Sequence, residues 1–111
     1  MVYTYVLYSA KDGRWYTGVA KDLQARMREH HAGRVRSTRS RLPVMLAYYE
    51  ACLDDVDAYR RERYLKSGGG KRYLRKRLSG WLSHTWPIEL ERQQWPNSPQ
   101  LDGRPPGAVL T

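Results

Sequence analysis

Two short runs of β-branched and aromatic residues, joined by turn residues, begin this chain and constrain its fold more than any other feature. The runs occupy positions 2–8 and 15–19, and the sequence KDGR at 11–14 lies between them. Such a pattern is typical of a β-hairpin. The chain is therefore expected to start with two paired antiparallel strands, whose apolar face must be covered by another layer of structure.

The turn also predicts how the two strands pair. If two residues form its tip, opposed residues have numbers that sum to 25, and Tyr5 faces Ala20. Because side chains alternate between the two faces of a strand, Tyr5 and Tyr16 should project from the same face, and Gly18 should leave a gap between them. Two phenols beside a gap suggest a pocket wall, whereas ordinary cross-strand aromatic packing is the alternative.

Hydrophobic periodicity and helix-stop signals predict the elements that follow the hairpin. A helix is expected at 21–32, with Asp22 as its cap and Gly33 at its end. The order β-β-α-β-α-α predicts an α+β fold, a small three-stranded, mainly antiparallel sheet flanked by helices. The later elements are a basic loop at 33–42, a strand at 43–50, a helix at 54–66, a glycine hinge at 67–70 and a helix at 71–83.

Charge and proline content divide the chain near residue 86. Residues 1–86 hold 18 basic and 8 acidic side chains, whereas five of the six prolines lie beyond them. We therefore expect one domain at 1–86 and a Pro-rich tail at 87–111, disordered or loosely packed, which offers a surface for a protein partner. The net charge of +9 favours a polyanionic partner for the domain.

Cysteine content and hydropathy predict a cytoplasmic protein without membrane contact. Cys52 is the one cysteine, so no internal disulfide can form, as is usual in a reducing compartment. The first residues lack the basic start and apolar stretch of a signal peptide. No apolar run approaches the roughly 20 residues that a bilayer span needs.

Three polar side chains interrupt or border the apolar faces of the predicted helices. Arg26 and His30 lie one turn apart beside the apolar stripe of the first helix, and should face the margin of the sheet. Glu62 interrupts a mainly apolar face of the second helix. Since a buried carboxylate needs a partner, Glu62 either forms a salt bridge with Arg26 or Arg60, or binds Mg²⁺ or Mn²⁺.

Five sequence elements occur in a fixed order: Tyr3-Thr4-Tyr5, Tyr16-Thr17-Gly18, Arg26, His30 and Glu62. Together they resemble the GIY-YIG nuclease superfamily, and in particular its short stand-alone bacterial members, over about residues 2–80. The chain departs from the name-giving motifs, because Tyr3 and Thr4 replace the glycine and isoleucine of the first and Thr17 takes the middle place of the second.

The resemblance implies a nuclease that uses one divalent cation, Mg²⁺ or Mn²⁺. A tyrosine with its ordinary pKa near 10 is a poor base at neutral pH, so nearby cations would have to lower that pKa. The resemblance assigns activation of the attacking water to Tyr5, places Tyr16 near the same water and phosphate, and gives Gly18 the role of keeping that approach open. It assigns stabilisation of phosphate charge to Arg26, proton transfer or support of the tyrosine network to His30, and metal binding to Glu62.

The expected function is that of an endonuclease that hydrolyses DNA phosphodiester bonds in DNA repair or processing. RNA is the alternative nucleic acid, and a non-catalytic nucleic-acid-binding module of the same fold is the alternative function. Basic side chains around the candidate site are expected to hold phosphates without reading bases. They are Lys21, Arg34, Arg36, Arg39, Arg41 and Lys71.

Overall fold

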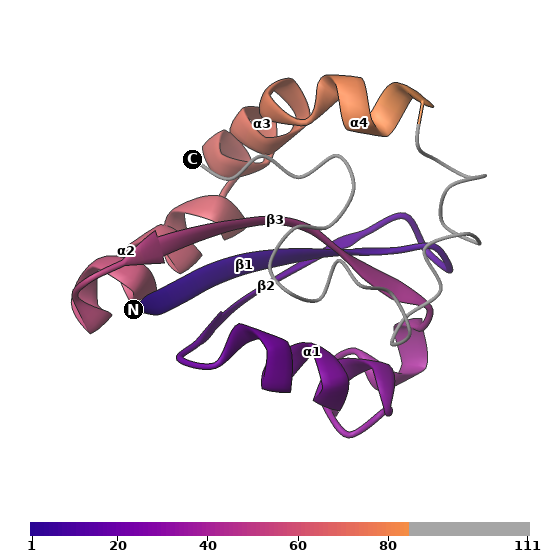
Figure 1. Ribbon diagram of the computed structural model, residues 1–111. Helices are drawn as coiled ribbons and strands as arrows, with labels where there is room; N and C mark the ends of the chain where they lie inside the picture. Colours follow the sequence, from indigo (N-terminus) through magenta and orange to yellow (C-terminus); the bar gives the residue numbers. More distant parts are fainter. Residues whose placement is uncertain (85–111) are drawn as a thin grey trace.

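A computed structural model of the protein describes residues 1–84. Three strands, β1 (Val2–Ser9), β2 (Trp15–Ala20) and β3 (Val44–Cys52), form an antiparallel sheet in the order β2-β1-β3 (Figure 1). The predicted α+β fold is confirmed. The tail expected at 87–111 lies outside the described residues.

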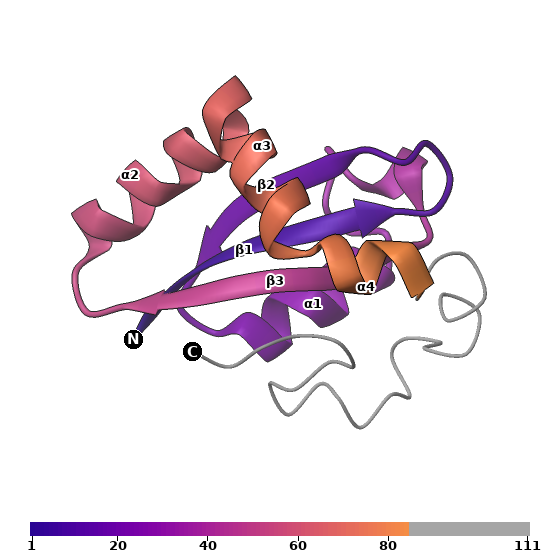
Figure 2. The same ribbon diagram turned by 90° about the horizontal axis from the view of Figure 1, so that it is seen from above.

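Helices cover both faces of the sheet, as Figures 1 and 2 show. α1 (Leu23–His31) lies on one face, and a core that includes Tyr5, Leu7 and Met27 fills the space between. The other face carries α2 (Asp55–Lys66), α3 (Gly68–Arg77) and α4 (Ser79–His84) over a second core. Within residues 1–84, no helix is long and apolar enough to cross a membrane.

The hairpin pairs two residues away from the predicted register. Tyr5 faces Gly18, because the turn takes four residues instead of two. The turn is closed by a hydrogen bond from Gly13 N to Ser9 O of 2.8 Å, and Gly13 has a φ of 69° that suits glycine. A shift of two residues keeps every side chain on its face, so Tyr5 and Tyr16 still project from the same face.

The cap predicted for the first helix is confirmed, and of the two aspartates that could begin the second helix, Asp54 and Asp55, the first is the cap. Asp22 accepts a hydrogen bond of 3.0 Å from Ala25 N at the start of α1, and Asp54 accepts one of 2.9 Å from Val56 N at the start of α2. After α1 the chain turns at Gly33, whose φ is 76°.

The predicted glycine hinge at 67–70 is wrong. Ser67 caps a new helix by accepting from Gly70 N at 3.1 Å, and the three glycines form the first turn of α3. Glycine is required at position 70, since a Cβ there would collide with the carbonyl oxygen of Tyr64. The helix expected at 71–83 is divided, because α3 ends at Arg77 and α4 begins at Ser79.

Candidate active site

Gly18 leaves space that the ring of Tyr5 occupies. A Cβ built at Gly18 would lie 2.6 Å from the hydroxyl oxygen of Tyr5 and 2.7 Å from its Cζ. Tyr5 is fully buried, whereas Tyr16 on the neighbouring strand is half-buried, with its ring centroid 6.3 Å from that of Tyr5. The gap predicted at Gly18 is thus not open but filled by the Tyr5 ring, so Gly18 sets the position of the Tyr5 hydroxyl.

A chain of hydrogen bonds runs from Tyr5 into α1 and the following loop. The Tyr5 hydroxyl bonds to His30 Nε2 at 2.8 Å, and His30 Nδ1 bonds to Thr38 Oγ1 at 2.7 Å. All three side chains are fully buried, and the ring of Tyr16 lies 5.3 Å from the His30 ring, edge on. Sequence analysis missed Thr38, because it lies in a loop without periodicity and nothing local marks it.

Burial keeps both the histidine and the tyrosine neutral. It lowers the pKa of His30 to about 4, helped by the nearby charge of Arg26. Burial also raises the pKa of Tyr5 to about 12, although Arg26 acts in the opposite direction. Arg26 alone therefore does not hold the pKa of Tyr5 low, since loss of solvent outweighs the guanidinium.

Arg26 stands one turn before His30 and brings a permanent positive charge to this cluster. Its Nη1 donates to Glu29 Oε1 at 2.8 Å, and this hydrogen bond, followed by its interaction with Tyr5, raises the pKa of Arg26. The side chain is 37% exposed. It is therefore accessible to an anion while it remains next to the Tyr5 hydroxyl.

Glu62 belongs to α2, which packs against β1 and β2 from the other face of the sheet. Its carboxylate is 21% exposed and pairs with Lys66 Nζ at 3.1 Å, one turn along the same helix. The predicted salt-bridge partners are thus wrong, since Arg26 pairs with Glu29 and Arg60 lies 3.8 Å from Asp57. The contacts above join the other five candidate residues, whereas Glu62 lies in the helical layer on the other face of the sheet, where it pairs with Lys66.

The donor set suits a cation that needs few protein ligands. Among residues 1–84, no three His, Cys, Asp or Glu side chains gather into a metal-binding group. Mg²⁺ and Mn²⁺ sites of the nuclease type take one or two carboxylates, with waters and substrate phosphates completing the shell. A partly exposed Glu62, opposed only by one surface lysine, fits this requirement.

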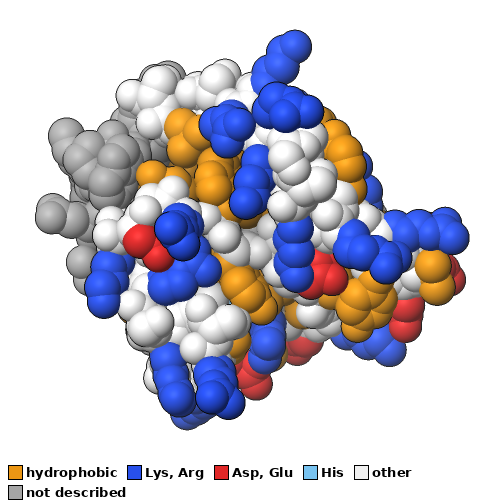
Figure 3. Space-filling view, turned by 180° about the vertical axis from the view of Figure 1, so that it is seen from behind, with side chains coloured by type: hydrophobic (Ala, Val, Ile, Leu, Met, Phe, Trp, Pro, Cys, Tyr) orange, Lys and Arg blue, Asp and Glu red, His pale blue; other side chains and the backbone are white. Residues whose placement is uncertain are grey.

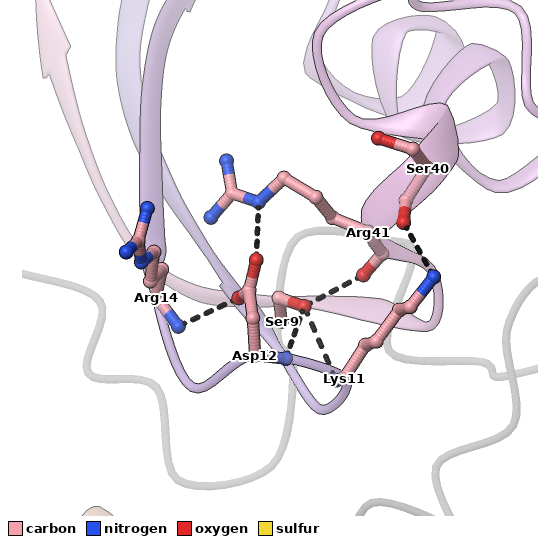
Figure 4. A network of polar contacts seen from close by, with 6 residues as sticks. All are labelled: Ser9, Lys11, Asp12, Arg14, Ser40 and Arg41. Carbon is pink, nitrogen blue, oxygen red and sulfur yellow. Dashed lines mark hydrogen bonds and ion pairs between the residues drawn. The ribbon is translucent and has the colours of Figure 1, made fainter.

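The basic loop at 33–42 is anchored on the β1–β2 turn, as Figure 4 shows. Ser9 Oγ donates to Arg41 O at 2.6 Å, and Lys11 Nζ donates to Ser40 O at 3.0 Å. Arg41 Nε donates to Asp12 Oδ2 at 3.1 Å, so this arginine also holds the loop in place. The other predicted phosphate contacts are exposed: Lys21, Arg34, Arg36, Arg39 and Lys71.

The buried histidine predicts an acid-sensitive fold. The unfolded chain binds a proton at His30 below pH 6.5, whereas the folded chain does so only below about pH 4. Stability should therefore fall as pH drops from 6.5 towards 4, by about 3 kcal/mol. Urea unfolding at pH 7, 5.5 and 4.5 measures this loss, and His30→Gln should flatten most of it.

His31 provides the matched control for that measurement. Its pKa is also lowered by burial, although a hydrogen bond between its Nε2 and Val44 O at 3.0 Å acts in the opposite direction. His31→Gln should keep most of the acid sensitivity of the wild type. Equal losses of stability in wild type and His30→Gln would show that His30 binds a proton equally well in the folded and the unfolded chain, which would contradict the lowered pKa.

The sheet, the paired tyrosines and the adjoining arginine and histidine belong to one small α+β domain. The sequence model of a protein family described as the GIY-YIG catalytic domain matches residues 1–81 of this chain. The chain therefore belongs to the GIY-YIG family, as its motifs predict.

Its relatives within this family are UPF0213 proteins. One from Desulfotalea psychrophila is 41% identical over 66 residues, which are 58% of this chain and 59% of that protein. One from Halobacterium salinarum is 40% identical over 67 residues, which are 60% of this chain and 86% of that protein. The solution NMR structure of a UPF0213 protein from Bacillus halodurans is 30% identical in sequence and has a TM-score of 0.41. The match covers 86% of this chain and 98% of that protein.

Proposed function

We propose that this chain is a divalent-metal-dependent endonuclease that hydrolyses DNA phosphodiester bonds, in DNA repair or processing. The observation that carries the proposal is the buried hydrogen bond from Tyr5 to His30 beneath Gly18, with the charge of Arg26 beside it. Buried titratable side chains with shifted pKa values and a neighbouring charge are typical of functional sites. Family membership supports the same function.

Because its raised pKa keeps Tyr5 neutral, this side chain is suited to relay a proton, and it does not act as a free phenolate. If the Tyr5 hydroxyl donates to His30 Nε2, its oxygen can accept a proton from an attacking water while it releases its own to that nitrogen. His30 Nδ1–H then donates to Thr38 Oγ1, which holds the required tautomer. Developing negative charge on the phosphate would favour the protonated histidine.

Arg26 and Glu62 complete the proposed site. Arg26 neutralises charge on the phosphate oxygens, as a guanidinium in a partly water-excluded site does well. Glu62 would hold one Mg²⁺ or Mn²⁺, which supplies charge neutralisation and help for the leaving oxygen when bound. Lys66 pairs with Glu62 on the surface, and a divalent cation would displace it from the carboxylate.

A non-catalytic nucleic-acid-binding module is the second candidate. The observation that favours it is the high pKa of Tyr5, about 12, together with a Glu62 carboxylate already paired with lysine. This candidate predicts binding without turnover, so one experiment separates the two.

Glu62→Gln should reduce metal-dependent cleavage about a thousandfold, because an interaction worth several kcal/mol in the transition state is lost. The assay uses labelled single-stranded, duplex and branched DNA and RNA with Mg²⁺ or Mn²⁺. Binding is measured in parallel in EDTA, where the variant should match the wild type. Asp57→Asn removes an exposed carboxylate from the same helix and should leave cleavage unchanged.

The same assay decides between the candidates. Products that disappear in EDTA and in Glu62→Gln would support the nuclease and identify its substrate. Tight binding without products on any of the substrates would instead assign the chain to the non-catalytic module. Cleavage that persists in Glu62→Gln would contradict metal binding at this residue.

A further inference from the structure

The C-terminal part of α2 and the whole of α3 form the most strongly basic stretch of the described chain. Residues 63–77 hold seven basic side chains and no acidic one. By contrast, α2 begins with the acidic residues Asp55 and Asp57. The seven basic residues are Arg63, Lys66, Lys71, Arg72, Arg75, Lys76 and Arg77.

Four of these side chains share the solvent face of α3. At 100° per residue, Lys71, Arg72, Arg75 and Lys76 fall within an arc of about 140°. All four are exposed. We call them the α3 basic face. The opposite side of the helix is buried against the sheet and holds Gly70, Leu74 and Leu78.

Nothing within residues 1–84 neutralises this face. The ion pairs formed in this part of the chain lie elsewhere, and none involves a residue of α3. Lys71 and Arg75 stand four residues apart, as do Arg72 and Lys76, and like charges at this spacing repel. The helix therefore carries repulsion that a polyanion would relieve.

The α3 basic face belongs to the helix that directly follows the one with the candidate metal ligand, and it lies on a different side of the sheet from the basic loop. Only Ser67 separates α3 from α2, whose Lys66 contacts Glu62. The loop at 33–42 follows α1 and is anchored on the β1–β2 turn, while α3 covers the opposite face of the sheet (Figure 1). Figure 3 shows Lys and Arg side chains spread widely over one side of the molecule, with few acidic ones between them.

The chemistry of this face fits a phosphate backbone better than a membrane surface. Helices that bind lipid insert large apolar side chains beside their cations. The large hydrophobic side chains exposed in the described chain are Met1, Leu53, Val56, Tyr59 and Tyr64, and none of them lies on α3. A helix face made of cations suits the phosphates of a nucleic acid, which it positions without reading sequence.

We infer that the α3 basic face binds the backbone of the nucleic acid outside the scissile phosphate, as a second contact surface apart from the basic loop. This inference rests on the proposed function, because it takes the polyanion to be the nuclease substrate. It implies that substrates long enough to reach α3 as well as the candidate site bind more tightly than short ones.

The test compares two triple variants of the full chain that lose the same charge. Arg72, Arg75 and Lys76 are changed to Gln in the first, and Arg14, Arg28 and Arg60, exposed on other elements, are changed to Gln in the second. Binding to duplex DNA is measured in EDTA from 50 to 300 mM salt. The α3 variant should bind about a hundredfold more weakly at 0.1 M salt, and its salt slope should fall by about 2.7.

Folding is checked in the same variants. Because Gln and the basic residues have similar helix propensities and the like-charge repulsion is removed, the α3 variant should melt at or above the wild-type temperature. Weaker binding together with undiminished thermal stability would support the inference. The control variant should keep most of its affinity and salt slope.

Three other outcomes would overturn the inference, and they are distinguishable. If wild type binds DNA and the α3 variant keeps the full salt slope, the α3 contact is wrong while the proposed function stands. If wild type binds neither DNA nor RNA at 50 mM salt, the proposed function fails too. The third outcome concerns vesicles that contain 30 mol% phosphatidylserine, roughly a cytoplasmic-leaflet composition. If wild type binds these vesicles more tightly than it binds nucleic acid, and the α3 variant loses this vesicle binding, the partner is a membrane.

Discussion

Gly18→Ala should reduce cleavage at least about a hundredfold in a protein that still folds. The added methyl carbon would lie 2.6 Å from the Tyr5 hydroxyl and 2.7 Å from its Cζ, closer than such atoms can approach. The fully buried Tyr5 ring must then move, which breaks the 2.8 Å hydrogen bond to His30. Positioned proton transfer contributes about 10²–10⁴-fold, and overpacking costs about 1–3 kcal/mol of stability.

A double-mutant cycle with Tyr5→Phe tests whether the loss runs through the tyrosine hydroxyl. Tyr5→Phe alone should lose about as much activity as Gly18→Ala. Combining the two should then cost far less cleavage than the sum of the separate effects, since the interaction is already gone. A Gly18→Ala protein with wild-type turnover, or fully additive effects, would remove Tyr5 from the proposed mechanism.

Gly70→Ala should give the largest loss of stability, about 3 kcal/mol, which lowers the melting temperature by at least about 12 °C. The new Cβ would collide with the carbonyl oxygen of Tyr64 and lie 2.5 Å from Leu65 Cα. Both are backbone atoms of α2, so no side chain can rotate to make room. The first turn of α3 would have to separate from α2, which opens the core around Leu65 and Leu74.

Gly69→Ala is the matched control, because it lies in the same turn. Its Cβ would meet Arg72 Nη2 at 3.7 Å and Tyr64 Cε1 at 3.8 Å, which are ordinary contacts. Alanine favours a helix over glycine by about 1 kcal/mol, so this variant should melt at or above the wild-type temperature. Thermal unfolding followed by circular dichroism checks both, and equal melting temperatures would contradict the packing at Gly70.

Local patterns in the sequence predicted the elements and the faces of the side chains well. Alternation along β1 and β2 placed Tyr5 and Tyr16 on one face even though the predicted register was wrong, because a shift of two residues preserves the face. Helical spacing placed Arg26 and His30 one turn apart towards the sheet. These relations depend only on backbone geometry, which neighbouring residues determine.

Contacts between distant segments could not be predicted from such patterns. Thr38 bonds to His30 because the loop is anchored on the hairpin turn, and no local signal marks that approach. The residues at 67–70 were expected to form a hinge, but close contact with α2 makes them the first turn of a helix. The mistaken partner of Glu62 is a different case, since Lys66 stands four residues further along the same helix and helical spacing alone indicates that pair.

The sequence by itself thus determined the α+β fold, the family and the residue types available for phosphodiester chemistry, because these follow from short-range periodicity and motif spacing. Only the tertiary structure decided the protonation states of the site. Burial raises the pKa of Tyr5 and lowers that of His30, and burial depends on the layers that close over them. The structure likewise placed α3 with its basic face towards solvent, because Leu74 and Leu78 turn the other side of that helix towards the sheet.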